Sequence, residues 1–211
     1  MNTRLVRILM ATFIILTLSI FSTSAQDKNS IVIAQGTDAA SLDPQRQNDA
    51  FTTSILSNIF DTLIYRDVDL NLVPGLATEW TLVDDTTWEV ILREGISFHN
   101  GEAFDAEDVK FTLERPLDPD LGSPLASRFA VIEGVDVIDP LTVHVRTTTP
   151  YPLLPARLSE WFIMPKDYSE ATDLDTLAEQ PVGTGAYIFE SWTPIPSPKR
   201  GKQKRTFAVK S

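Results

Sequence analysis

The sequence has no cysteine at any of its 211 positions. Disulfides are therefore excluded, and an exported chain without them must be held together by ordinary packing rather than as a small stapled domain. A lipid anchor attached to an N-terminal cysteine is excluded for the same reason. Hydrophobic residues make up 43% of the chain, which is enough to bury a genuine core. Length alone predicts one domain, or two small ones.

A long apolar run is also missing. The run from Ile8 to Phe21 falls short of the ~20 residues that a membrane-spanning helix needs. It follows the basic residues Arg4 and Arg7 and leads into small residues that end at Ala25. This pattern predicts a cleaved signal peptide over residues 1–25, with an uncleaved N-terminal anchor as the alternative. We therefore expect a soluble periplasmic or secreted product.

Basic residues are scarce in the body of the chain. The net charge is −11, yet residues 199–211 hold 6 of the 18 basic residues and none of the acidic ones. Residues 26–198 are left with 10 basic residues against 29 acidic ones. A body of that charge repels DNA and RNA, so we expect no nucleic-acid partner.

The common catalytic signatures are absent from the sequence. It contains no GxSxG, no HExxH, no P-loop and no cysteine nucleophile. The "GTG" at residues 183–185 is too short for a dinucleotide site and predicts a glycine turn where two segments cross. His144 falls on the polar face of a predicted strand, with no partner at a motif spacing. We predict no catalytic residue and no cofactor.

One stretch, "FHNGEAFDAEDVKF" at residues 98–111, sets a histidine among four carboxylates. It could be a metal site, an acid/base cluster or neither. Asn100-Gly101 predicts a tight turn with positive φ. Asp105 precedes an apolar helical pattern as an acidic N-cap, with more carboxylates in the first turn. Metal ligands would have to share one helix face, and His99 lies across the turn. The stretch therefore predicts a turn and a helix cap, and no metal site.

The remaining pattern alternates strands with short helices. A strand is predicted near residues 31–34, and apolar residues at helical spacing from Phe51 to Leu63 predict a helix capped by Asn48 or Asp49. Hairpins are predicted at residues 78–93 and 135–147. We expect Trp80 and Trp88 to pair across the first hairpin, and "WFIMP" at residues 161–165 to form a strand.

Five segments of the chain come together in a familiar order. They are "SLDPQ", "IFDTLIYRD", "LVPGLATEW", "WEVILREGISFHNGEAFDAEDVKFTLER" and "PVGTGAYIFESW". In this order they closely resemble the family 5 solute-binding proteins of ABC importers, the oligopeptide, dipeptide and nickel type, across residues 31–192. The resemblance implies an α/β, periplasmic-binding-protein-like fold of class II, with a small domain inserted into the first of two lobes. It also implies a monomer that delivers a peptide-like solute to an ABC permease.

The resemblance divides the chain into parts. Residues 27–65 and 165–192 correspond to lobe I, and residues 66–164 to the inserted small α+β domain. Members of the family are about twice this length or more, so the chain is expected to be truncated before the second lobe. Residues 193–211 are expected to be a basic tail, foreign to the fold or disordered, as a frameshift or premature stop would produce. An interaction module that uses this tail is the alternative.

The resemblance also implies where a solute would bind. In peptide-binding relatives the segment after "SLDP" lines the cleft, which corresponds here to Asn48, Asp49, Ala50 and Phe51. The inserted domain contributes the residue after "SP", here Leu125. Relatives carry an acidic and an aromatic residue at two of these places, and Asn48 and Leu125 depart from that pattern.

A second function class follows from the carboxylates of the predicted first hairpin. A secreted hydrolase could use Asp84 and Asp85 as an acid/base pair. Adjacent carboxylates in a turn point apart, which is poor geometry for shared acid/base chemistry. The solute-binding hypothesis is therefore preferred, and the hydrolase is kept as the alternative.

Overall fold

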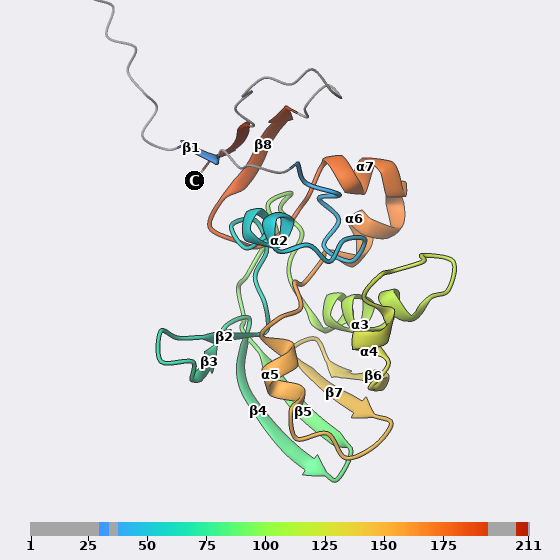
Figure 1. The fold of residues 1–211 in the computed structure, drawn as a ribbon. Helices are drawn as coiled ribbons and strands as arrows, with labels where there is room; N and C mark the ends of the chain where they lie inside the picture. Colours follow the sequence, from blue (N-terminus) through green and yellow to red (C-terminus); the bar gives the residue numbers. More distant parts are fainter. Residues whose placement is uncertain (1–29, 34–37, 194–205, 211) are drawn as a thin grey trace, which may run out of the picture.

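A computed structural model describes residues 30–33, 38–193 and 206–210 and shows a mixed α/β chain (Figure 1). The strands are β1 Ser30–Ile33, β2 Ile64–Arg66, β3 Leu72–Pro74, β4 Ala77–Asp84, β5 Thr87–Leu92, β6 Ile132–Asp139, β7 Thr142–Thr147, β8 Ile188–Thr193 and β9 Thr206–Lys210. The helices are α2 Ala50–Leu56, α3 Ala106–Glu114, the 3-10 turn η1 Arg115–Leu117, α4 Ala126–Phe129, α5 Leu154–Leu158, α6 Lys166–Ala171 and α7 Leu174–Glu179. Within the described ranges, none of these helices has the length and apolar character to cross a membrane.

Two hairpins build a four-stranded antiparallel sheet in the order β4-β5-β7-β6, and helix α3 packs beside β6 (Figure 1). The alternation of apolar residues predicts both hairpins, and both are confirmed. The two tryptophans of the first hairpin do not pair directly: Trp80 is opposite Val90, and Trp88 is opposite Leu82. The two tryptophans are therefore diagonal neighbours on the same face of the hairpin, and both pack against the larger of the two hydrophobic cores described below. The apolar pattern predicts the face, but the exact partners depend on where the turn sets the register.

The first core lies under this sheet, and a second core lies around α2. The larger core runs from Leu63 to Ile163 along the chain and includes buried residues of β5, β6, β7 and α3. The smaller core consists of Ala39, Leu42, Ile55, Leu56, Ile59, Phe60 and Met164. The chain thus passes from one core to the other between residues 60 and 63 and again between 163 and 164. The predicted limits of the inserted domain, 66 and 164, lie near these crossings and stay predictions.

A smaller antiparallel sheet has the order β1-β9-β8. Its middle strand comes from the segment expected to be a foreign or disordered tail, residues 193–211. Thr193 ends β8, and Thr206–Lys210 form β9, which pairs with β1 on one side and β8 on the other. At these five residues the structure shows a strand, because both neighbouring strand edges offer backbone partners. Residues 194–205 and the predicted signal peptide, 1–25, lie outside the described residues. The foreign origin of the segment stays a prediction.

Helix α2 is shorter than the apolar spacing predicts. It ends at Leu56, and Phe51, expected on its apolar face, is exposed. The carbonyl of Ile59 accepts a hydrogen bond from Gly185 N at 2.8 Å instead of continuing a helix. A Cβ added at Gly183 would clash with the Ile59 carbonyl oxygen, and one at Gly185 would lie 2.6 Å from the Ile59 carbonyl carbon. The predicted glycine turn at crossing segments is confirmed, and this crossing stops the helix.

The stretch at residues 98–111 forms the predicted turn and cap. Gly101 has a φ of 91°, and Asp105 accepts a hydrogen bond from Glu107 N at 2.8 Å as the N-cap of α3. Asp108 Oδ2 accepts from Asp105 N at 2.9 Å and completes a capping box. The His99 ring does not turn toward these carboxylates: its Nε2 lies 2.8 Å from the Gly185 carbonyl oxygen. His99 therefore stabilises the glycine turn at residues 183–185 by a hydrogen bond.

The strand predicted for "WFIMP" does not form. Only an isolated bridge joins Phe162 to Thr62, and Ile163 N donates to the Asp61 carbonyl oxygen at 2.9 Å. Pro165, which has no N–H, follows as the N-cap of α6 and prevents a longer ladder. The apolar run reflects burial against both cores rather than a strand.

Candidate functional site

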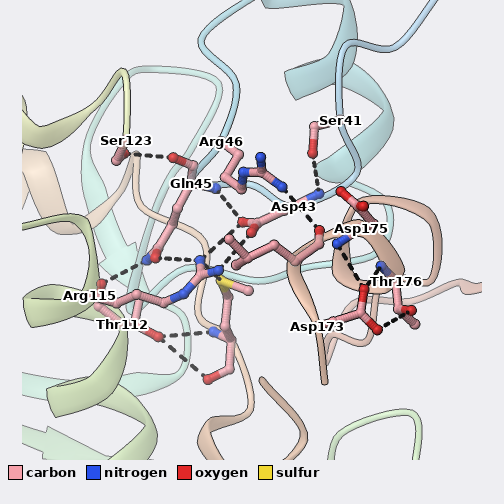
Figure 2. A network of polar contacts seen from close by, with 12 residues as sticks. Ser41, Asp43, Gln45, Arg46, Thr112, Arg115, Ser123, Asp173, Asp175 and Thr176 are labelled. Carbon is pink, nitrogen blue, oxygen red and sulfur yellow. Dashed lines mark hydrogen bonds and ion pairs between the residues drawn. The ribbon is translucent and has the colours of Figure 1, made fainter. Parts of the chain in front are cut away.

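The "SLDPQ" segment is a buried turn that is bonded to the end of helix α3. Ser41 Oγ accepts a hydrogen bond from Asp43 N at 3.1 Å, and Asp43 Oδ1 accepts from Gln45 N at 2.9 Å. Arg115 donates to both carboxylate oxygens of Asp43, at 3.2 and 2.8 Å (Figure 2). Such a two-pronged charge-assisted pair fixes geometry as well as contributing energy. The turn is thereby tied to the C-terminal end of α3.

Gln45 extends this network toward the loop before α4. Its Nε2 donates to the Thr112 carbonyl at 2.8 Å, and its Oε1 accepts from Arg115 at 3.0 Å. The backbone oxygen of Gln45 accepts from Ser123 Oγ at 2.6 Å, as Figure 2 shows, and Ser123 Oγ in turn accepts from Leu125 N at 3.1 Å. The loop that carries Leu125 is therefore held against the "SLDPQ" turn.

The same turn is held from the opposite side by helix α7. Leu42 N donates to the Ala178 carbonyl at 2.9 Å, and Arg46 Nη1 donates to the Leu174 carbonyl at 3.1 Å. Asp173 caps α7 by accepting from Thr176 N at 2.9 Å. The end of α3 and helix α7 thus position the turn together.

A pocket of about 510 Å³ opens at the junction of the two cores. That volume lies within the range of small-molecule sites in proteins. Four segments of the chain supply its lining, and each carries both polar and apolar side chains. The lining residues are Pro44, Gln45, Gln47, Asn48, Thr53, Ser57, Phe60, Asp61, Thr62, Tyr65, Leu125, Arg128, Phe129, Ser159, Glu160, Trp161 and Phe162.

The structure brings two of the five predicted binding residues to this pocket. Asn48 and Leu125 line it, although they come from the two different parts of the chain. Asp49 instead caps α2 by accepting from Thr52 N at 2.8 Å. Ala50 and Phe51 form the exposed start of that helix and do not line the pocket. The helix begins one residue after Asp49, so the chain turns away from the pocket there.

Three charged side chains line the pocket. Asp61 accepts from Tyr65 Oη at 2.7 Å and from Thr184 Oγ1 at 3.0 Å. Burial is the main cause that raises the pKa of Tyr65 well above its usual range, and the hydrogen bond to Asp61 is the second. Tyr65 therefore remains a donor at any physiological pH. Glu160 is paired with Arg157 at 3.0 Å.

The third charge is Arg128, an exposed residue of α4. Its guanidinium has no hydrogen-bond or ion-pair partner among the described residues. The neighbouring Phe129 is buried and stacks on Trp161, with ring centroids 4.1 Å apart and planes at 22°. Sequence reasoning missed Arg128 and Trp161 because they lie in or beside very short helices, where no periodicity marks a face.

Asp84, one of the two carboxylates of the alternative hydrolase site, has structural partners. Asp84 Oδ1 accepts from Thr86 N and Thr87 N, both at 2.9 Å, and closes the β4–β5 turn. The backbone N–H of Thr86 is the largest cause that holds the pKa of Asp84 below its usual value. His144 Nε2 lies 3.1 Å from Glu89 Oε2 on the neighbouring strand. Across the described ranges, no group of three or more His, Asp or Glu side chains is placed to hold a metal ion.

A pocket of mixed polar and apolar lining lies where the two cores meet, and small-molecule sites generally have this character. Residues 71–196 match the family described as bacterial extracellular solute-binding proteins, family 5 Middle. The chain belongs to this family, as its five sequence segments predict.

Relatives and solved structures agree with this assignment. The chain is 31% identical over 163 residues to the glutathione-binding protein GsiB of Pectobacterium atrosepticum, covering 76% of this chain and 32% of that protein. NikZ from Campylobacter jejuni, solved with Ni(L-His), superposes with a TM-score of 0.68 at 29% identity, over 74% of this chain and 32% of NikZ. The periplasmic binding protein DppA from Helicobacter pylori, solved with the peptide STSA, superposes with a TM-score of 0.64 at 29% identity. The match covers 75% of this chain and 36% of DppA.

The predicted periplasmic-binding-protein-like fold is therefore confirmed. The chain spans about a third of the length of the curated relatives that it matches. These relatives are named as binding proteins, which points away from catalysis.

Proposed function

We propose that this chain acts as an extracytoplasmic solute-binding component of an ABC importer and holds a peptide-like solute in the pocket between the two cores. The observation that carries the proposal is that Asn48 and Leu125, which are distant in the sequence, both line this pocket. The family resemblance implies both positions from the sequence, and the polar network around Asp43 and Arg115 holds their segments together.

A peptide-like solute fits the chemistry of this wall. A peptide carries an ammonium group, a carboxylate and amides between them. The pocket offers the carboxylate of Asp61, the guanidinium of Arg128 and the amide of Asn48. Aromatic rings of Phe129 and Trp161 supply the apolar surface that small-molecule sites generally combine with a few placed polar groups. DppA, solved with STSA, is one relative that binds a peptide.

The proposal includes a partner and a location. A signal peptide over residues 1–25 would export the chain, and an ABC permease in the membrane would receive the solute from the monomer. In a longer relative, further residues would face this pocket and close over the solute. We propose that this chain alone, which offers one wall, binds its solute weakly.

Blocking the pocket tests the proposal. Tri-alanine is titrated into the full chain, and binding is followed by NMR. Leu125→Trp, which places a larger side chain in the pocket, should strongly reduce the response of the Asn48 side-chain amide. Val68→Thr, at the tip of the β2–β3 hairpin where Val68 is 98% exposed, is the control and should leave it unchanged. An unaltered response in Leu125→Trp would contradict the proposal.

A further inference from the structure

Arg128 differs from every other arginine in the described part of the chain. The other six each donate a hydrogen bond: Arg46, Arg66, Arg93, Arg115, Arg146 and Arg157. The guanidinium of Arg128 alone has no partner there, and Arg128 lines the pocket. A guanidinium presents a planar fork of donors that matches a carboxylate. An unpaired guanidinium beside a pocket is available to pair with an acidic group of a ligand.

Trp161 supplies a second donor without a partner. The residue is only 5% exposed, and its Nε1 is buried with no hydrogen-bond partner among the residues that the structure describes. An indole N–H can donate but never accept, so the missing partner has to be an acceptor. Stacking on Phe129, the neighbour of Arg128 in α4, holds the ring in place. Trp88 also has an unpartnered Nε1 within the described ranges, but Trp88 does not line the pocket.

Neither acidic residue of the pocket is paired with Arg128. Glu160 pairs with Arg157 at 3.0 Å and lies 3.9 Å from Arg66. Asp61 takes hydrogen bonds from Tyr65 and Thr184. Neither carboxylate forms an ion pair with Arg128, so its positive charge remains available to a bound molecule.

We infer that the pocket recognises a carboxylate of its solute, with Arg128 as the counter-ion and Trp161 Nε1–H as an additional donor. This inference rests on the proposed function and adds to it the chemical group that this wall selects. The carboxylate can be the terminus of a peptide or an acidic side chain, and both present the same two oxygens to the same donors.

Three tripeptides distinguish a terminal carboxylate from a side-chain carboxylate. Tri-alanine carries a terminal carboxylate, tri-alanine amide carries none, and Ala-Glu-Ala amide carries only a side-chain carboxylate. Each is titrated into the ¹⁵N-labelled full chain, and the indole N–H signal of Trp161 is assigned with Trp161→Phe, which keeps an aromatic ring on Phe129. We expect this signal to move downfield with at least one carboxylate peptide and to stay in place with tri-alanine amide.

Arg128→Gln provides the second measurement. The exposed side chain can be changed without disturbing a core, and loss of a charged hydrogen bond should weaken binding of the carboxylate peptide by roughly tenfold to a hundredfold. Binding of tri-alanine amide should be unchanged. Arg146→Gln, an arginine outside the pocket, is the matched control and should bind like the parent.

The outcomes separate this inference from the function on which it rests. If all three peptides perturb Asn48 equally, and Arg128→Gln affects none of them, the carboxylate inference is overturned and the solute-binding proposal stands. If the Trp161 signal stays in place while Arg128→Gln weakens every peptide alike, the inference also fails. If no peptide perturbs any pocket residue, both are overturned.

Discussion

Arg115 and Asp43 form a buried two-pronged ion pair that joins the "SLDPQ" turn to the end of α3. The Nη2–Oδ2 distance is 2.8 Å, and the side chains are 10% and 0% exposed. The two residues belong to the two parts of the chain that meet at the pocket. A buried charge that loses its partner stays desolvated and uncompensated, so this pair is costly to break from one side.

Arg115→Met should therefore lower the free energy of unfolding by about 3–5 kcal/mol. Urea denaturation measures the change. Arg146→Met is the matched control, because its pair with Asp136 is 38% and 52% exposed and should contribute under ~1 kcal/mol. Equal losses in the two variants would show that the buried pair has no special role.

The close packing of residues 183–185 against Ile59 leads to a second prediction about stability. Gly183→Ala would drive a Cβ into the Ile59 carbonyl, a backbone atom that cannot move cheaply. We expect a loss of about 1–3 kcal/mol, typical of overpacking, measured by thermal and urea denaturation.

Gly134→Ala is the control for this prediction. The nearest atom to its added Cβ is Arg146 Nη2 at 2.9 Å, the end of a flexible side chain. It should cost clearly less than Gly183→Ala. A neutral Gly183→Ala would mean that the two crossing segments can separate.

Local signals predict much of the fold because they act within a few residues. Gly101 accommodates a positive φ, and the Asp105 carboxylate accepts a hydrogen bond from the free N–H of Glu107, so the turn and the cap follow from the sequence. The end of α2 cannot be predicted in this way, because Gly185, which is distant in the sequence, donates a hydrogen bond to the carbonyl of Ile59. Arg128 and Trp161 can be identified as site residues only from the folded structure. Both line one pocket, and the Arg128 guanidinium and Trp161 Nε1 have no hydrogen-bond partner among the described residues.

The stability of the chain should depend on pH through Asp108. Burial raises the pKa of Asp108 to about 6 from its ordinary value of 3.8, although it accepts hydrogen bonds from Lys166 N and Asp105 N. The folded state therefore binds this proton more tightly than the unfolded state. Its contribution to stability is full below pH 3.8 and is lost as the pH rises through about 6.

The comparison of wild type with Asp108→Asn isolates this contribution. From pH 4 to pH 7 the wild type should lose up to about 3 kcal/mol relative to the variant, as two pKa units imply. Urea denaturation at several pH values gives the difference. A difference that does not change with pH would contradict the raised pKa.

The cap of α3 should be structural rather than metal-binding. Asp105→Ala should lower stability by ~1 kcal/mol, because Glu107 N loses its acceptor. Added Zn²⁺ should not raise the melting temperature. A rise of several degrees that disappears in His99→Ala would reveal a metal site at this turn.

The last prediction concerns affinity. The pocket of this chain is lined by Asn48, Leu125 and Arg128 among others, and the chain matches 32% of the length of GsiB from Pectobacterium atrosepticum. Sites of this kind bury most of a ligand's surface, and one wall leaves the other side of a solute in water. Loss of half the contacts should remove several kcal/mol, and each 1.4 kcal/mol is about tenfold in affinity. Calorimetry with a peptide library and glutathione, run in parallel on the Pectobacterium protein, should therefore show far weaker binding by this chain. A monomeric, cooperatively melting chain that binds a peptide at micromolar affinity or tighter would show that this wall is sufficient.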